Sequence, residues 1–200
     1  MTASVFSRAV GGEGKVCAVD VTDLRVVHEG FQFNLTEGAR LPFADDSFDV
    51  VVSNHVLEHV GLGVNPTEQL EHLREVGRVL TKDGHGYLAT PNRWAPIEPH
   101  FSVPFLTWIP ARWRTPYLAK TGKARVYDCR PLSSRELKAS FEAAGLTAEE
   151  QTYEAMKLVA RMERPWIGTR LALRAPQSLL KALHPIIPTY VFKLRPKASI

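Results

Sequence analysis

Several side chains that could bind a ligand or move a proton follow short apolar runs of the chain. Asp20 ends one such run, Glu37 follows a second, and Ser53, Asn54 and His55 end a third. Carboxylates and hydroxyls can hold the hydroxyl groups of a ligand, and histidine titrates near neutral pH. These residue types are suited to ligand binding and to acid–base chemistry.

One short stretch also matches a metal-binding pattern. His55, Glu58 and His59 have the spacing H-x-x-E-H of inverted zinc proteases, in which two histidines one helical turn apart bind zinc. Here the pattern begins at the end of a predicted strand, and no downstream helix offers a convincing third ligand. We therefore expect no metal site, and hydrogen-bonded structural histidines are the ordinary alternative.

The elements that must position these groups alternate between strands and helices. Strands are predicted at 15–21, 31–35, 47–55, 86–90 and 189–195, and 147–156 could be another. Helices are predicted at 66–80, ended by Gly84, and at 133–146, where Ser133 and Glu136 have capping-box spacing. The valines of 47–55 predict burial on both faces of that strand. This order predicts an α/β fold with a mostly parallel sheet, which binds ligands at the carboxyl ends of its strands.

Composition places the chain among ordinary globular proteins. It has 200 residues, 44% of them hydrophobic and 23% charged, which suits a single domain over residues 1–200. Cys17 and Cys129 are the only cysteines, too few for a disulfide framework. The sequence shows neither a secretory signal nor a transmembrane stretch, so we expect a cytoplasmic protein that could be peripheral to the membrane.

Two blocks of sequence carry a family resemblance. Residues 37–60 read EGARLPFADDSFDVVVSNHVLEHV, and residues 73–92 read LREVGRVLTKDGHGYLATPN. Together they resemble class I S-adenosylmethionine-dependent methyltransferases, in the type 11 branch that includes quinone-biosynthesis C-methyltransferases. The resemblance covers residues 15–92 and implies a Rossmann-like sheet, mostly parallel with an antiparallel final strand.

The resemblance implies S-adenosylmethionine as the cofactor and assigns residues to it. Asp20, with Val21 beside it, would accept hydrogen bonds from both ribose hydroxyls. Glu37 and Gly38 would contact the adenine amino group, and Leu41 would line the adenine pocket. The methionine part and the sulfonium would lie at the end of the strand 47–55, where the residues are Ser53, Asn54 and His55.

Two histidines are the candidate catalytic residues. Methyl transfer is an in-line displacement, so the enzyme mainly holds the nucleophile, the methyl group and the sulfur in line. A base is needed only if the acceptor keeps a proton. His55 is the best placed titratable group for that role, and His100 is the second candidate.

The glycine-rich cofactor loop of this family does not occur in the sequence. In the family it follows the first strand, whereas Gly11, Gly12 and Gly14 precede the strand that ends at Asp20. Residues 4–10 resemble the end of the family's first helix. We therefore expect the first strand to be missing, which would leave strand edges unpaired. Two hypotheses stay open: a methyltransferase, and a catalytically inactive methyltransferase-like partner or regulatory module.

The C-terminal half is predicted to select the acceptor. Residues 93–131 are interpreted as an acceptor-binding lid, and 157–188 as a helical insertion before the last strand. Residues 101–200 carry a formal charge of +10, against −6 for residues 1–100. Aromatic and basic side chains alternate in the lid, which suits a small or lipid-linked, anionic acceptor and could also bring it to a membrane surface. No motif supports nucleic acid, and a packed accessory subdomain is the alternative.

Overall fold

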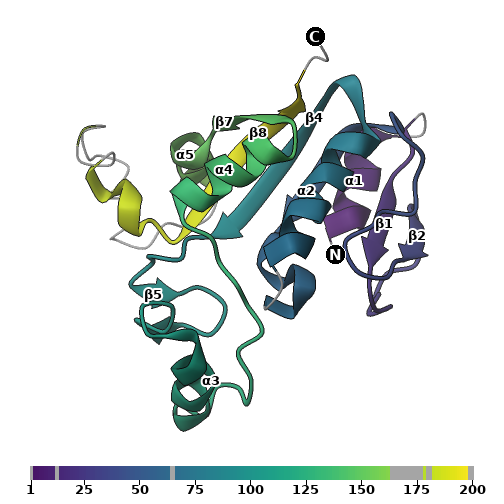
Figure 1. Cartoon of the computed structure of the whole chain (residues 1–200). Coiled ribbons are helices and arrows are strands. Elements are labelled where there is room, and N and C mark those ends of the chain that lie inside the picture. The colour runs from purple at the N-terminus through teal and green to yellow at the C-terminus, as the bar shows by residue number, and fades with distance from the viewer. Residues whose placement is uncertain (1, 12–13, 64–65, 163–177, 179–181, 198–200) are drawn as a thin grey trace.

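The chain alternates between strands and helices in the computed structural model shown in Figure 1. The structure describes residues 2–11, 14–63, 66–162, 178 and 182–197. The first half contains α1 (Thr2–Val10), β1 (Cys17–Asp20), β2 (Gln32–Leu35), β3 (Phe48–Asn54), the 3-10 helix η1 (Leu57–Gly63) and α2 (Pro66–Val79). Then follow β4 (Leu80–Pro91), β5 (Ile97–Glu98), β6 (Val103–Pro104), α3 (Ala111–Lys120), α4 (Ser134–Ala143), β7 (Leu146–Glu150), α5 (Thr152–Met162), the 3-10 helix η2 (His184–Ile186) and β8 (Thr189–Pro196).

The main strands form two sheets that no backbone pairing joins within the described residues. β1 pairs in parallel with β2, and the larger sheet has the order β3-β4-β8-β7. β3 and β4 are parallel, whereas β8 runs antiparallel to both β4 and β7. Three strands of the larger sheet therefore share one direction and the last strand of the chain opposes them. This arrangement confirms the predicted mixed sheet.

One hydrophobic core covers a face of the larger sheet. Side chains from α2, α4, β4, β7 and β8 pack together there, and α4 lies in front of the sheet in Figure 1. Leu73, Leu88, Phe141 and Phe192 are among the fully buried residues. Phe141 and Phe192 meet edge to face, with 5.0 Å between their ring centroids. The packing holds β4 between β3 and β8 and so fixes the carboxyl ends of these strands.

The strand β3 is buried on one face only. Val51 packs against the core, whereas Val50 is 50% exposed and Val52 is 36% exposed. Successive side chains of a strand point to opposite faces, and only the face of Val51 is covered. The prediction that the valine run is buried on both faces is therefore wrong.

Local signals predicted some elements well and others poorly. The capping box of α4 is present, because Ser133 Oγ accepts from the Glu136 N–H and Glu136 reaches back to the Ser133 N–H. Gly84 does not end a helix. It lies inside β4, where an added Cβ would stand 3.0 Å from the carbonyl oxygens of Phe48 and Asp49, so glycine is required by the approach of β3.

The segment 147–156 is not one strand. β7 ends at Glu150, and α5 begins at Thr152, whose buried hydroxyl accepts from the Val191 N–H over 3.1 Å. Much of the predicted helical insertion 157–188 lies outside the described residues. Its described ends are part of α5 and the short helix η2.

Residues 93–131 fold into a small unit with a core of their own. The strands β5 and β6 pair as an antiparallel hairpin, and α3 follows them. Val103, Leu106 and Leu118 are fully buried, and Phe101 and Tyr127 pack against them. The segment therefore contains regular elements packed around a small buried core. In Figure 1 the unit lies below the larger sheet.

Candidate functional site

A buried glutamate lies where β3 and β4 end. Glu58 of η1 has a side chain with no exposed surface. His100 Nε2 lies 2.9 Å from its Oε1, and His55 Nδ1 lies 3.3 Å from the same oxygen. The Thr90 hydroxyl donates to Oε2 over 3.1 Å. Both carboxylate oxygens of Glu58 therefore have partners, and two histidines from separate segments contact the same oxygen.

The charges of this cluster depend on one another. Burial raises the pKa of Glu58, but the hydrogen bonds from His100 and His55 outweigh burial and lower that pKa to about 2. The hydrogen bond to Glu58 in turn raises the pKa of His100, against the opposing effect of burial. When Nε2–H of His100 donates to Glu58, its Nδ1 is the ring atom that can accept a proton. The pair has the form of a general base held by a carboxylate.

The backbone fixes His55 at the edge of the cluster. Its φ is +53°, in the left-handed region that residues other than glycine seldom occupy. The His55 N–H donates to the carbonyl of Ala89 over 2.8 Å, which continues the pairing of β3 with β4. A left-handed residue directly after a strand turns the chain towards η1 and so brings Glu58 back towards the end of the sheet.

Two sets of side chains in the described part of the chain could hold a metal ion. One is His59, His100 and Cys129, the other is His55, Glu58 and His100, and within each set the ligand atoms lie within 4.8 Å of one another. Neither set contains both histidines of the H-x-x-E-H pattern, because that pattern spans a strand end and a 3-10 helix. Burial also raises the pKa of the Cys129 thiol, which keeps the thiol protonated.

Two of the side chains at strand ends are hydrogen-bonded to other parts of the protein. Ser53 Oγ lies 3.2 Å from Nε2 of the buried His72, and burial lowers the pKa of His72 to about 4. The Asn92 side chain donates to the carbonyls of Pro185 and Ile187 and accepts from the Trp94 N–H. The Ser53 and Asn92 side chains are therefore engaged with protein groups, whereas Asn54 is exposed.

The predicted ribose and adenine residues lie on the smaller sheet and the loop after it. Asp20 is exposed at the end of β1, and its Oδ1 accepts from the Val21 N–H over 2.7 Å. Its Oδ2 therefore remains available to a ligand hydroxyl. Glu37 and Gly38 follow β2 and are exposed, and Gly38 has a φ of +64°. The predicted positions are confirmed as strand ends, but these residues and the Glu58 cluster lie on separate sheets.

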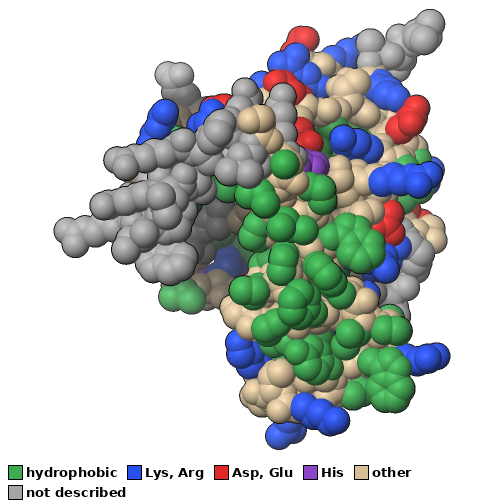
Figure 2. All heavy atoms as spheres, turned by 90° about the vertical axis from the view of Figure 1, so that its left-hand side faces the viewer, with side chains coloured by type: hydrophobic (Ala, Val, Ile, Leu, Met, Phe, Trp, Pro, Cys, Tyr) green, Lys and Arg blue, Asp and Glu red, His purple; other side chains and the backbone are tan. Residues whose placement is uncertain are grey.

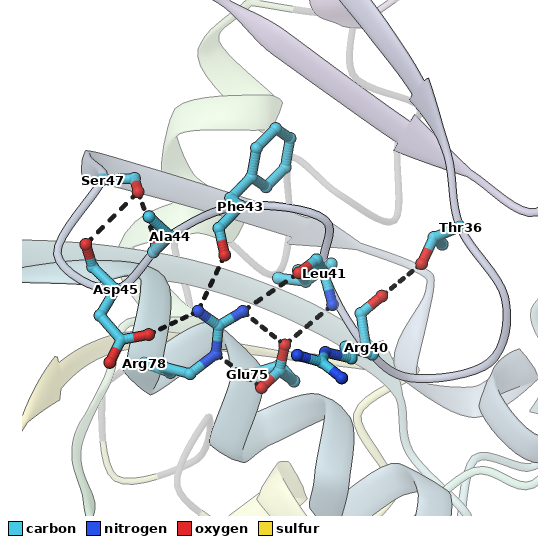
Figure 3. Close-up of polar contacts among 9 residues, drawn as sticks. All are labelled: Thr36, Arg40, Leu41, Phe43, Ala44, Asp45, Ser47, Glu75 and Arg78. Carbon is cyan, nitrogen blue, oxygen red and sulfur yellow. Dashed lines mark hydrogen bonds and ion pairs between the residues drawn. The ribbon is translucent and has the colours of Figure 1, made fainter.

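An arginine of α2 holds the loop that carries the predicted adenine residues (Figure 3). Arg78 donates through Nε and Nη2 to both oxygens of Glu75, each over 2.7 Å. Its Nη1 donates to the Phe43 carbonyl and to Asp45, and its Nη2 also donates to the Leu41 carbonyl. The Leu41 N–H donates to Glu75 Oε2 over 2.9 Å. Both backbone polar groups of Leu41 are therefore fixed, which ties the loop 36–47 to α2.

Sequence reasoning found the histidines but not the residues that hold them. His55 and His100 were predicted from their residue type, and the structure brings their rings to 5.5 Å between centroids. In the sequence Glu58 stands out only as part of a zinc pattern, and no pattern marks Thr90, Glu75 or Arg78. The H-x-x-E spacing was the available signal for Glu58, since it puts an acid three residues after the histidine.

Sequence comparison shows that the first part of the chain is similar to methyltransferases. Residues 3–88 match the family described as a methyltransferase domain. Two probable S-adenosylmethionine-dependent methyltransferases, from two strains of Mycobacterium tuberculosis, are each 38% identical over 87 residues. The match covers 40% of this chain and 28% of each relative. The chain thus spans little more than a quarter of the length of these curated relatives.

Solved structures of similar fold cover nearly the whole chain. An S-adenosylmethionine-dependent methyltransferase from Mesorhizobium loti has a TM-score of 0.57 at 17% identity, covering 95% of this chain and 85% of its own. A putative methyltransferase bound to the Trm112 activator of Haloferax volcanii has a TM-score of 0.55 at 16% identity, covering 100% and 80%. The [4+2]-cyclase SpnF has a TM-score of 0.53 at 16% identity, covering 99% and 72%. At these identities the likeness establishes the fold alone.

Proposed function

We propose that the protein transfers a methyl group from S-adenosylmethionine to a hydroxyl-bearing acceptor, because residues 3–88 match the family described as a methyltransferase domain. The observation that carries the proposal is the buried Glu58, which holds His55 and His100 at the carboxyl ends of β3 and β4. Ligands of open α/β sheets bind at these ends.

The residues present suit part of a nucleoside-containing ligand. Asp20 offers a free carboxylate oxygen to a ribose hydroxyl, and the loop 36–47 carries Glu37 and Gly38 on a backbone that Arg78 fixes. When bound, S-adenosylmethionine supplies a methyl group on a positively charged sulfur. The family's glycine-rich loop, which would add backbone contacts, does not occur in this sequence.

The chain itself would position the acceptor and take its proton. S-adenosylmethionine would supply the methyl group to the acceptor oxygen and leave as S-adenosylhomocysteine, and the chain's own part would be to take the hydroxyl proton at Nδ1 of His100. Glu58 stabilises the resulting imidazolium, because its carboxylate is ionised and 2.9 Å from Nε2. His55, 3.3 Å from the same oxygen, is the second base candidate.

We assign the acceptor to small or lipid-linked molecules that carry negative charge. Support comes from the unit 93–131, where Arg93 lies over the ring of Trp94 and Arg112 over that of Trp113. Such pairs offer an apolar face beside a fixed positive charge. His100, the proposed base, belongs to this same unit.

Transfer of a labelled methyl group tests the proposal. The protein is incubated with methyl-labelled S-adenosylmethionine and a protein-free cell extract, and label is followed into lipid and small-molecule fractions. We expect label in an acceptor, and a loss of about 100-fold or more in the His100→Ala variant. The exposed His28 supplies the control, His28→Ala, which should keep the rate. Equal rates in both variants would contradict the assigned role of His100.

The second candidate function is that of a catalytically inactive module with this fold. It is favoured by the lack of backbone pairing between β1 and β3, because the ribose and sulfonium positions lie on these two strands. Such a module would leave the label on the donor. A stable complex with a second protein would then be its function.

A further inference from the structure

Four aromatic side chains form a continuous exposed surface on the unit 93–131. Trp94, Phe105, Trp108 and Trp113, which we call the aromatic surface, are each 45–55% exposed. The rings of Trp94 and Trp108 lie 6.5 Å apart, and those of Phe105 and Trp108 lie 5.0 Å apart, both edge to face. Phe105 and Trp113 line one shallow pocket of about 250 Å³. Exposed side chains of this size seldom gather on a surface that has no partner.

Positive charge surrounds the aromatic surface. Arg93 lies over Trp94 and also pairs with Glu136 at 3.5 Å. Arg112 lies over Trp113, and Lys120 lines the pocket. Figure 2 shows hydrophobic side chains gathered on this side of the molecule, with lysine and arginine side chains at the lower edge, where the unit 93–131 lies. An apolar patch with a cationic rim therefore faces outward.

Most of the aromatic surface lies in a stretch of sequence that has no acidic residue. Residues 99–127 contain no aspartate or glutamate, but they contain five basic residues: Arg112, Arg114, Lys120, Lys123 and Arg125. Lys123 is exposed, and its ammonium group donates to the Ser102 carbonyl. A partner that meets this face would gain electrostatically only if it were anionic.

We propose that the aromatic surface docks onto the interface of an anionic lipid bilayer. Tryptophan side chains favour the boundary between headgroups and acyl chains, and nearby lysine and arginine bind anionic headgroups. The proposed contact is peripheral, made by side chains at the interface. Among the described residues no helix is long and apolar enough to cross a membrane. The proposal stands on the surface alone and does not require methyl transfer.

Vesicle co-sedimentation of the full chain tests the proposal. Phosphatidylcholine vesicles with and without phosphatidylserine are compared at low and high salt. We expect binding to the anionic vesicles only, weaker at high salt because salt screens charge. Acyl-brominated lipids should quench tryptophan fluorescence, since the rings would enter the acyl boundary.

Matched variants distinguish binding through the aromatic surface from nonspecific binding to the vesicles. Trp113→Ser and Lys120→Glu should each lower the partition coefficient by about fivefold or more. The controls are Leu24→Ser, which removes an exposed apolar side chain after β1, and Lys82→Glu, which makes the same charge change at the start of β4. Both controls should bind as the unchanged protein does. Near-ultraviolet circular dichroism checks folding, and the surface substitution Lys120→Glu keeps the test valid if Trp113→Ser unfolds.

Three results would overturn the proposal. The first is no binding to anionic vesicles by the folded chain. The second is an equal loss of binding in the test and control variants. The third is a dimer in sedimentation velocity that Trp113→Ser abolishes while vesicles stay unbound, which would assign the surface to a second copy of the chain.

Discussion

At the scale of single residues, the proposed chemistry depends on one carboxylate and the two histidines that it contacts. Glu58 has no exposed surface, yet its carboxyl is ionised because hydrogen bonds to His100 and His55 outweigh burial. Glu98 and Asp128 also act to raise the pKa of His100. The basicity of His100 is therefore set by its surroundings, most strongly by Glu58.

The Glu58→Gln variant tests this coupling through the pH dependence of methyl transfer. A general base must be neutral, so the rate should rise with pH through the raised pKa of His100. Removing the charge of Glu58 lowers that pKa, so the midpoint of the profile should move to lower pH, and the plateau rate should fall with the weaker base. NMR titration of the His100 ring should show the same shift. An unchanged midpoint, or the same shift in the exposed control Glu71→Gln, would contradict the coupling.

The sequence predicts which residues are reactive better than it predicts what holds them. His55 and His100 stand out by residue type. The partnership of His100 with Glu58 joins residues 42 positions apart and depends on how the unit 93–131 packs against η1. The positive φ of His55 depends on its pairing with β4. No local pattern encodes either feature.

At the scale of elements, the loop 36–47 depends on its attachment to α2. Arg78 binds Glu75 with two parallel hydrogen bonds and also reaches the carbonyls of Leu41 and Phe43. The ion pair with Arg78 lowers the pKa of Glu75, so both partners stay charged. A planar guanidinium can make these contacts together, whereas an ammonium group cannot.

Arg78→Lys should therefore loosen the predicted adenine loop without changing the net charge. We expect weaker binding of S-adenosylhomocysteine and a loss of about 1–3 kcal/mol in the free energy of unfolding, because charge-assisted hydrogen bonds are lost. Calorimetric titration and urea denaturation measure the two effects. Arg74→Lys, at an exposed position on the same helix, is the control. Unchanged binding and stability in Arg78→Lys would show that the contact does not hold the loop.

The capping box of α4 predicts a smaller, purely structural effect. Ser133→Ala removes the hydroxyl that accepts from the Glu136 N–H, so the free energy of unfolding should fall by about 1 kcal/mol. Urea denaturation measures it, with Ser134→Ala inside the helix as the control. A loss no larger than that of the control would mean that the cap adds nothing to stability.

Elements encoded by neighbouring residues were predicted, and those set by distant contacts were not. The Ser133–Glu136 spacing defines the start of α4 within four residues. Gly84 resembled a helix stop because it follows a helical pattern, but the approach of the Phe48 and Asp49 carbonyls explains it. The break between β7 and α5 likewise depends on a hydrogen bond between Thr152 and the distant Val191.

At the scale of the whole molecule, the order of elements was predictable and the relation between the two sheets was not. The alternation of apolar runs and amphipathic helices indicated the α/β class, and the resemblance implied a mostly parallel sheet with an antiparallel final strand. Within the described residues no backbone pairing joins β1 to β3, so no strand pairing fixes how the two sheets lie relative to each other. The fold itself does not define the reaction, since a [4+2]-cyclase is among the similar structures.

Calorimetric titration of the 200-residue chain with S-adenosylhomocysteine tests the central claim most directly. The methyltransferase account predicts binding in the micromolar range, about −8 kcal/mol, that Asp20→Ala weakens and His55→Ala leaves nearly intact. Asp20 would hold the ribose, whereas His55 would be the second candidate, after His100, for taking the acceptor proton. A folded chain that gives no binding heat, or one in which His55→Ala weakens binding more than Asp20→Ala, would contradict the account.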